Sequence, residues 1–238
     1  MIPLQKAEEM TRDSLASYID QSVLKPEFTQ GEIRRYIQEG IDFKCKTVCV
    51  NPSSLPVARE LCRGKGTGIC VVCDFPFGQS STESKVAQAE FILKDGGVED
   101  LDAVLNYGWM RSGLWDRTGA EIEALARCCR VHGAILKVIL ETDALTMEET
   151  ARAVETACTA GAGFVKTSTG FFSGGNSRGA SPDVIAVMME AAKGRCKVKG
   201  AGGVRTQEHF FRLINMGIDR MGIGYKSTPV ALGAGALD

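Results

Sequence analysis

Two segments decide the fold of this chain: FVKTSTG, residues 164–170, and KVKGAGGVRT, residues 197–206. Each begins with a short apolar run, brings a lysine (Lys166 or Lys199) to its end and continues into a loop rich in Gly, Ser or Thr. An ammonium group at the end of a buried strand is unfavourable unless other groups compensate its charge. A second ammonium nearby disfavours the charged form of the first, and a neutral lysine condenses with a carbonyl to give a Schiff base. The key question is therefore whether the two lysines meet in one pocket.

Outward from these segments, short β-branched runs alternate with amphipathic stretches. The expected strands are residues 18–20, 47–50, 68–74, 100–105, 135–141, 163–167, 197–199 and 220–222. The expected helices are residues 32–38, 83–95, 120–131, 147–160, 182–192 and 207–216. Capping residues such as Thr29 and Thr146 precede several helices, and glycines often follow them.

Eight strands that alternate with helices over more than 200 residues predict an α/β fold, a (β/α)8 TIM barrel with a short N-terminal helix. The alternative is an open doubly wound sheet, which more often has fewer strands or a clear dinucleotide fingerprint. Because no Pro- or Ser-rich linker divides the chain, we expect one domain over residues 1–238.

The composition excludes several classes of protein. Apolar content of 44% and a formal net charge of −1 are typical of a globular protein that binds neither nucleic acid nor membrane. The first residues carry mixed charge and lack the apolar region of a secretory signal, so we expect a cytoplasmic protein.

The nine cysteines are expected to be reduced and packed as small apolar side chains, with a redox or metal role as the alternative. Cys70 and Cys73 form a CxxC on an expected strand, where residues three apart face opposite sides. His132 and His209 are the only histidines, and no second CxxC completes a zinc site. We therefore expect no bound metal.

In a TIM barrel the chemistry lies at the carboxyl ends of the strands. Polar residues stand there in otherwise apolar runs: Asp20, Ser22, Asp74, Asp102, Lys137, Glu141, Lys166 and Lys199. We expect Lys137 and Glu141 to orient neighbouring groups, and the Phe171–Phe172 pair to serve in packing.

With these residues assembled, the chain resembles the 2-deoxyribose-5-phosphate aldolases, the DeoC family of class I aldolases with a TIM barrel. The likeness runs from about residue 18 to 224 and also includes YIDQSVLKP (18–26), TVCVNPSSL (47–55), VVCDFPFGQSSTESKVAQAE (71–90), LDAVLNYGWMRSG (101–113) and LKVILET (136–142). The resemblance implies a lyase of deoxyribonucleotide and carbohydrate catabolism that forms its Schiff base at Lys166. Lys199 would keep that amine neutral and take part in proton transfer, and Asp102 would relay protons with Lys199 and a water. The resemblance implies a homodimer and no cofactor.

The implied reaction is the reversible cleavage of 2-deoxy-D-ribose 5-phosphate to acetaldehyde and D-glyceraldehyde 3-phosphate. The expected substrate-binding residues are Asp20, Ser22, Thr169, Gly170, Gly202, Gly203, Arg205, Gly224 and Lys226.

Two segments depart from the family pattern. After the last strand, Gly224-Tyr225-Lys226 replaces phosphate-binding hydroxyls, and the loop after strand six is longer and adds Arg178. Lys226 and Arg178 are candidates to hold a phosphate in their place. The alternatives are an aldolase of the same kind with a different or unphosphorylated substrate and a non-catalytic sugar-phosphate-binding relative; the pair of buried lysines argues against the latter.

Overall fold

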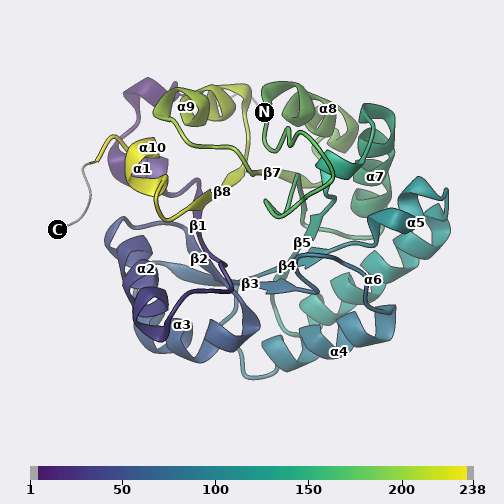
Figure 1. Ribbon diagram of the computed structural model, residues 1–238, viewed down its shortest axis with the longest axis horizontal. Coiled ribbons are helices and arrows are strands. Elements are labelled where there is room, and N and C mark those ends of the chain that lie inside the picture. Colours follow the sequence, from purple (N-terminus) through teal and green to yellow (C-terminus); the bar gives the residue numbers. More distant parts are fainter. Residues whose placement is uncertain (1–4, 235–238) are drawn as a thin grey trace.

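The computed structural model describes residues 5–234, in which eight parallel strands close into a barrel inside a ring of helices (Figure 1). The strands pair in chain order, and the last pairs with the first. They are β1 (Ile19–Val23), β2 (Thr47–Val50), β3 (Gly68–Cys73), β4 (Asp100–Val104), β5 (Ile135–Ile139), β6 (Phe164–Lys166), β7 (Lys197–Ala201) and β8 (Arg220–Gly224). The predicted TIM barrel is confirmed.

The helices surround the barrel and include one short helix before β1, as predicted. They are α1 (Arg12–Ala16), α2 (Gln30–Asp42), α3 (Leu55–Cys62), α4 (Thr82–Leu93), α5 (Tyr107–Arg111), α6 (Trp115–Val131), α7 (Met147–Thr159), α8 (Pro182–Ala192), α9 (Gln207–Met216) and α10 (Thr228–Ala231). Three single 3₁₀ turns complete the list: η1 (Ala7–Glu9), η2 (Pro52–Ser54) and η3 (Thr142–Ala144).

The predicted helices all occur, and α8 and α9 have the expected bounds. Helices α3, α5 and α10 were not predicted, because segments of 4 to 8 residues hold too few turns to show a helical period. At α2 and α7, Thr29 and Thr146 form capping boxes with Glu32 and Glu149, which fixes where each helix begins.

Side chains alternate between the two faces of every strand, and the two faces differ in chemistry. Outward residues such as Val48, Val71, Leu101 and Val138 pack against the helices in the main core. Inward residues include Asp20, Asp102, Lys137, Lys166 and Lys199, which bond to one another inside the barrel. The interior of this barrel thus holds a network of paired charges beside a small apolar cluster, whereas many TIM barrels are filled with branched apolar side chains.

The cysteines divide between these faces, with one departure from expectation. Cys70 belongs to a small inner cluster and Cys73 to the outer core, so the CxxC pair does face opposite sides. Cys158 on α7 and Cys196 before β7 form a disulfide, which corrects the expectation that all cysteines are reduced. The two residues are 38 positions apart, and the packing of α7 against α8 brings their sulfurs together.

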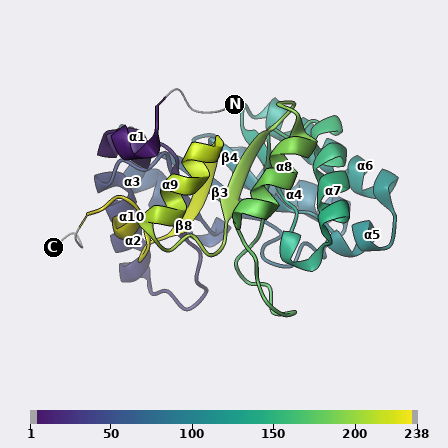
Figure 2. The same cartoon turned by 90° about the horizontal axis from the view of Figure 1, so that it is seen from above.

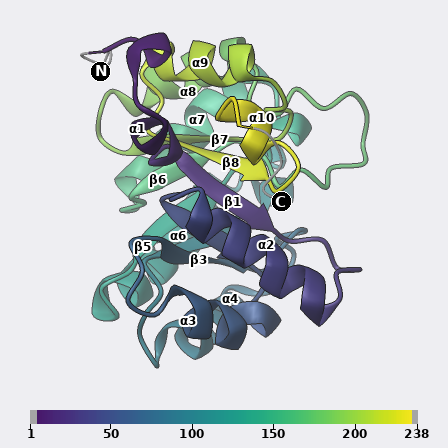
Figure 3. The same cartoon turned by 90° about the vertical axis from the view of Figure 1, so that its left-hand side faces the viewer.

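The carboxyl ends of the strands open on one side of the molecule. The β1–α2 loop and the long β6–α8 loop both project on that side (Figure 2, Figure 3). None of the helices within residues 5–234 is both long and apolar enough to cross a membrane.

Candidate active site

Lys166 and Lys199 meet at one oxygen atom. The Nζ atoms of both lysines donate to Oδ2 of Asp102 at 2.8 Å, so they lie no further apart than twice that distance. β6 and β7 are neighbours with Lys166 and Lys199 in register, and Asp102 reaches them from β4 across the barrel. All three side chains are buried, with Lys166 only 3% exposed. The question raised by the sequence is answered: the lysines share one site.

Below this oxygen lies a second layer of paired charges. Asp20 contacts Lys199 and Lys137, the latter at 2.9 Å, and Arg220 donates to Asp20 at 2.9 Å. Lys137 also bonds to Asp100. Because the Asp20 carboxylate is fully buried and held by three cations, it supports Lys199 and is not a wall of the substrate pocket. This places the sequence-predicted Asp20 in a supporting position.

The charges decide which of these groups stay ionised. Burial alone would raise the pKa of Asp102, but Lys166, Lys199 and Lys137 outweigh burial and hold that pKa well below its usual range. Burial alone would lower the pKa of Lys199, but Asp102 and Asp20 outweigh burial and raise it. In the resting site near neutral pH, Lys199 is therefore charged and Asp102 is ionised.

Glu141 braces the loop that follows Lys166. Its backbone lies in the left-handed region with φ of 54°, a conformation that costs a non-glycine residue roughly 1–3 kcal/mol. Its buried carboxylate accepts hydrogen bonds from the backbone N–H of Thr169 at 3.3 Å and from Thr169 Oγ1 at 2.5 Å. Burial raises the pKa of Glu141. The hydroxyl of Thr169, a sequence-predicted substrate residue, thus donates a hydrogen bond to Glu141. This contact agrees with the expectation that Glu141 orients a neighbouring group.

A pocket of about 640 Å³ opens beside the lysines, at the carboxyl ends of β7, β8 and β1. Six of the predicted substrate residues line it: Gly170, Gly202, Gly203, Arg205, Gly224 and Lys226. Ser22, Thr169 and Asp20 are not among its lining residues. Gly202 and Gly203 have φ of 85° and 80°, which only glycine adopts readily, so backbone N–H groups can face the pocket ahead of α9. The sequence did not single out Lys25, a further cation in the lining.

Tyr225 and Lys226 after β8 and Arg178 in the β6–α8 loop lie in different environments. Tyr225 stacks on Tyr36 with ring centroids 3.9 Å apart and also meets Phe28, so its ring is part of the packing on α2. Lys226 is exposed at the pocket, with its ammonium near the Tyr225 ring. Arg178 donates hydrogen bonds to the carbonyls of Thr142 and Leu145 and is not among the residues that line the pocket.

Three groups of side chains in residues 5–234 bring potential metal-ligand atoms together. Two lie in the barrel, Cys49–Cys70–Asp102 and Asp20–Cys70–Asp100, where lysines already bond the carboxylates. The third, Glu90–Cys128–His132, lies on α4 and α6, and a hydrogen bond of 2.7 Å between His132 and Glu90 closes it. In each group, the potential ligand atoms already interact with one another or with lysines.

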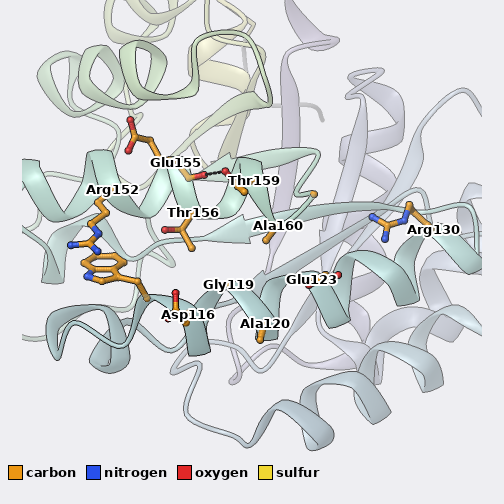
Figure 4. Close-up of a pocket in the computed structure, with 12 residues that line it drawn as sticks. Asp116, Gly119, Ala120, Glu123, Arg130, Arg152, Glu155, Thr156, Thr159 and Ala160 are labelled. Carbon is orange, nitrogen blue, oxygen red and sulfur yellow. Dashed lines mark hydrogen bonds between the residues drawn. The ribbon is translucent and has the colours of Figure 1, made fainter.

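A larger hollow of about 750 Å³ lies outside the barrel, between α6 and α7 (Figure 4). Arg152 covers the ring of Trp115 there, with its guanidinium carbon 4.3 Å from the centroid. None of the sequence-predicted site residues lines it, and no buried ionisable group faces it among the described residues. We therefore place the active site at the lysines and not in the larger hollow.

Sequence reasoning missed Asp100 and Arg220 as members of the charge cluster. A signal was present, because Asp100 precedes Asp102 by two residues, and Arg220 precedes the inward-facing Gly222 by two. Residues two apart on a strand share a face. The Phe171 ring, expected to serve in packing, contacts Phe75 at a centroid distance of 5.3 Å above the inner cluster.

Comparison with known proteins adds an independent finding. The model of the DeoC/LacD aldolase family matches residues 14–228. The chain is 37% identical over 213 residues to a deoxyribose-phosphate aldolase of Mannheimia succiniciproducens, with 90% of this chain and 92% of the relative covered. It is 39% identical over 209 residues to the enzyme of that name from Deinococcus radiodurans, with 88% and 92% covered.

Solved structures show the same likeness. The aldolase QR15 superposes with a TM-score of 0.83 at 34% identity and covers 91% of this chain and 94% of its own. A tetrameric deoxyribose phosphate aldolase from Aeropyrum pernix also gives a TM-score of 0.83, at 27% identity, with 94% and 91% covered.

Proposed function

Because this chain belongs to the DeoC/LacD family of aldolases, we propose that it is a class I aldolase that cleaves 2-deoxy-D-ribose 5-phosphate reversibly to acetaldehyde and D-glyceraldehyde 3-phosphate. The observation that carries the proposal is the contact of two buried lysines with one carboxylate oxygen. A binding protein has no use for a second ammonium beside an inward-facing amine, whereas Schiff-base chemistry requires a reactive amine and a proton donor beside it.

Lys166 is the nucleophile in this mechanism. Its Nζ attacks the C1 aldehyde and forms a carbinolamine, which loses water to give an iminium. The positive iminium then accepts the electron pair of the C2–C3 bond as that bond breaks, which leaves an enamine on Lys166 and releases glyceraldehyde 3-phosphate. Protonation of the enamine carbon and hydrolysis of the new iminium release acetaldehyde.

Asp102 and Lys199 move the protons. Oδ2 of Asp102 faces the Nζ atoms of both lysines, so it lies where a proton can pass between Lys166, Lys199 and a bound water. A carboxylate held ionised can accept the C3 hydroxyl proton through water, and Lys199 can supply a proton when the enamine is protonated. The Asp20–Lys137 layer below holds Lys199 in place.

The phosphate fits the pocket beside the lysines. Lys25, Arg205 and Lys226 supply positive charge, and the N-terminal end of α9 and its preceding glycines supply N–H groups. Gly222 connects this pocket to the lysines, because a Cβ atom at that position would lie 3.4 Å from Cε of Lys199. A five-carbon sugar phosphate can therefore extend from Lys166 to these cations.

One observation favours a second candidate, an aldolase of the same chemistry with an unphosphorylated acceptor. Glu27 and Glu32 line the same pocket, and Glu27 lies 3.5 Å from Lys25. Two carboxylates reduce the positive potential that a phosphate would meet. Turnover of acetaldehyde with glyceraldehyde, faster than with glyceraldehyde 3-phosphate, would favour this second candidate.

The decisive test is trapping of the Schiff base. The protein is incubated with acetaldehyde, reduced with borohydride, digested and mapped by mass spectrometry. We expect one reduced adduct, at Lys166, and none in Lys166→Arg, which keeps a cation beside Asp102. Cleavage of deoxyribose 5-phosphate is measured in parallel. An unmodified Lys166 in the wild-type protein would overturn the proposal.

Two further expectations belong with this function. We propose that the chain forms a homodimer and acts in the cytoplasm, as the family resemblance and the composition led us to expect. Light scattering on the purified protein measures the first: a mass twice that of the 25.5 kDa chain supports it, and a monomer or tetramer contradicts it.

A further inference from the structure

Two aromatic rings meet across the mouth of the barrel. Phe75 lies in the loop after β3, and Phe171 lies in the loop after β6. Strands β3 and β6 are not neighbours in the barrel. Their ring centroids are 5.3 Å apart in an edge-to-face arrangement with an interplanar angle of 85°. Such pairs gain roughly 0.5–1.5 kcal/mol beyond area burial. The contact therefore joins two loops over the carboxyl ends of the strands.

The floor beneath these rings is apolar and borders the catalytic groups. Phe75 packs against a buried inner cluster of Leu24, Cys49, Cys70 and Val72. The Cys70 thiol donates to Oδ1 of Asp102 at 3.1 Å, while the other oxygen of Asp102 holds both lysines. The two rings and the inner cluster thus form an apolar wall next to Asp102, the residue that holds both lysines.

The loop that carries Phe171 is fixed to the catalytic loop. The backbone N–H of Phe171 donates to Thr169 Oγ1 at 3.0 Å, and that hydroxyl donates to Glu141. The hydrogen bonds that hold the segment after Lys166 therefore also fix the backbone of Phe171. Its side chain is 39% exposed, so the ring stands between the inner cluster and solvent.

We propose that Phe75 and Phe171 form an apolar roof that excludes water from the enamine on Lys166 and directs it towards carbon–carbon bond formation. The inference rests on the proposed Schiff-base function. The enamine has two fates: its carbon attacks an acceptor aldehyde, or it takes a proton from Lys199 or from water and returns to the iminium, which water hydrolyses to acetaldehyde and the free amine. Both water-dependent steps slow when the site is dry. Phe75 and Phe171 act here as positioning residues, because they shape the site and exchange no proton.

The test uses acetaldehyde alone in D2O, so that it does not depend on the phosphate pocket. Deuterium entering the methyl group of acetaldehyde reports enamine protonation, either by water or by Lys199 after its ammonium protons have exchanged with D2O, and 3-hydroxybutanal reports carbon–carbon bond formation. We expect the ratio of deuterium exchange to aldol product to rise roughly five- to ten-fold in Phe171→Ala, because water then reaches the enamine. Phe171→Leu, which restores an apolar side chain, should return most of the wild-type ratio.

Phe172→Ala is the matched control. Phe172 is the adjacent residue of the same type, but its ring packs over Gly174 instead of Phe75. Its exchange ratio should equal that of the wild type. An unchanged ratio in Phe171→Ala, with the borohydride adduct still formed at Lys166, would overturn the roof alone. If wild-type Lys166 forms no adduct, both the roof and the aldolase function are overturned.

Discussion

Lys199 shows how one residue combines a structural and a chemical task. It donates to Asp102 and contacts Asp20, and its raised pKa keeps it charged at neutral pH. Lys166 shares the contact with Asp102, but its side chain is 3% exposed, whereas that of Lys199 is fully buried and also contacts Asp20. These differences fit the proposed roles, in which Lys166 is the nucleophile and Lys199 the proton donor.

This difference predicts the effect of Lys199→Leu. The variant should fold, because leucine fills most of the volume of the lysine, but kcat should fall by roughly 10²–10⁴-fold, since proton transfer to the enamine loses its donor. Steady-state cleavage of deoxyribose 5-phosphate measures this effect, and circular dichroism checks the fold. Lys197→Leu, an exposed lysine two residues earlier on β7, is the control and should keep wild-type kcat. Turnover like the wild type in Lys199→Leu would refute its role.

At the scale of elements, Lys85 joins four segments. It is fully buried on α4, and its Nζ donates to Glu121 on α6 at 2.8 Å, to the carbonyl of Gly78 at 3.0 Å and to that of Val104 at 2.9 Å. Val104 ends β4, the strand that carries Asp102. One ammonium thus positions two helices, the β3–α4 loop and the end of a catalytic strand.

We expect Lys85→Met to lower the free energy of unfolding by about 3–5 kcal/mol, because Glu121 would stay buried without its partner. Urea unfolding measures the change. The double variant Lys85→Met/Glu121→Leu should recover much of the loss, since no buried charge remains. Arg34→Ala, which breaks the exposed Arg34–Glu60 pair, should cost less than about 1 kcal/mol. Equal losses in Lys85→Met and Arg34→Ala would contradict this account.

For the whole molecule, the charged interior determines how stability depends on pH. The Asp20 and Asp102 pKa values lie below their unfolded values, so the stability that these carboxylates contribute is full above about pH 4 and is lost as pH falls further. The Lys137 and Lys199 pKa values are raised, so the contribution of these lysines is full below about pH 10 and is lost only as pH rises beyond it. Together, these pKa shifts predict that the free energy of unfolding stays nearly constant over a broad range of pH.

Urea midpoints measured from pH 3 to pH 9 test this plateau. The wild-type midpoint should stay nearly constant above about pH 5 and fall steeply below about pH 4. Asp102→Asn should have a lower midpoint at pH 7, because two ammonium groups lose their shared acceptor, and a shallower fall in acid. A variant with the acid profile of the wild type would show that Asp102 does not couple folding to protonation.

The sequence by itself determined the order and number of strands, the long helices, and Lys166, Lys199 and Asp102 as the residues to examine. These features rest on local signals: β-branched runs, helical periods and capping boxes each occupy a few adjacent residues. The short helices α3, α5 and α10 were not predicted, because each has too few residues to show a helical period.

Only the tertiary structure decided what those residues touch. It joined both lysines to one oxygen of Asp102 and paired Asp20 with Arg220 across 200 residues. It also bonded Cys158 to Cys196, placed Arg178 against the carbonyls of Thr142 and Leu145, and brought Phe171 against Phe75. The physical reason is closure of the barrel. Pairing β8 with β1 sets the register of every strand, and only then do side chains far apart in the chain come within bonding distance.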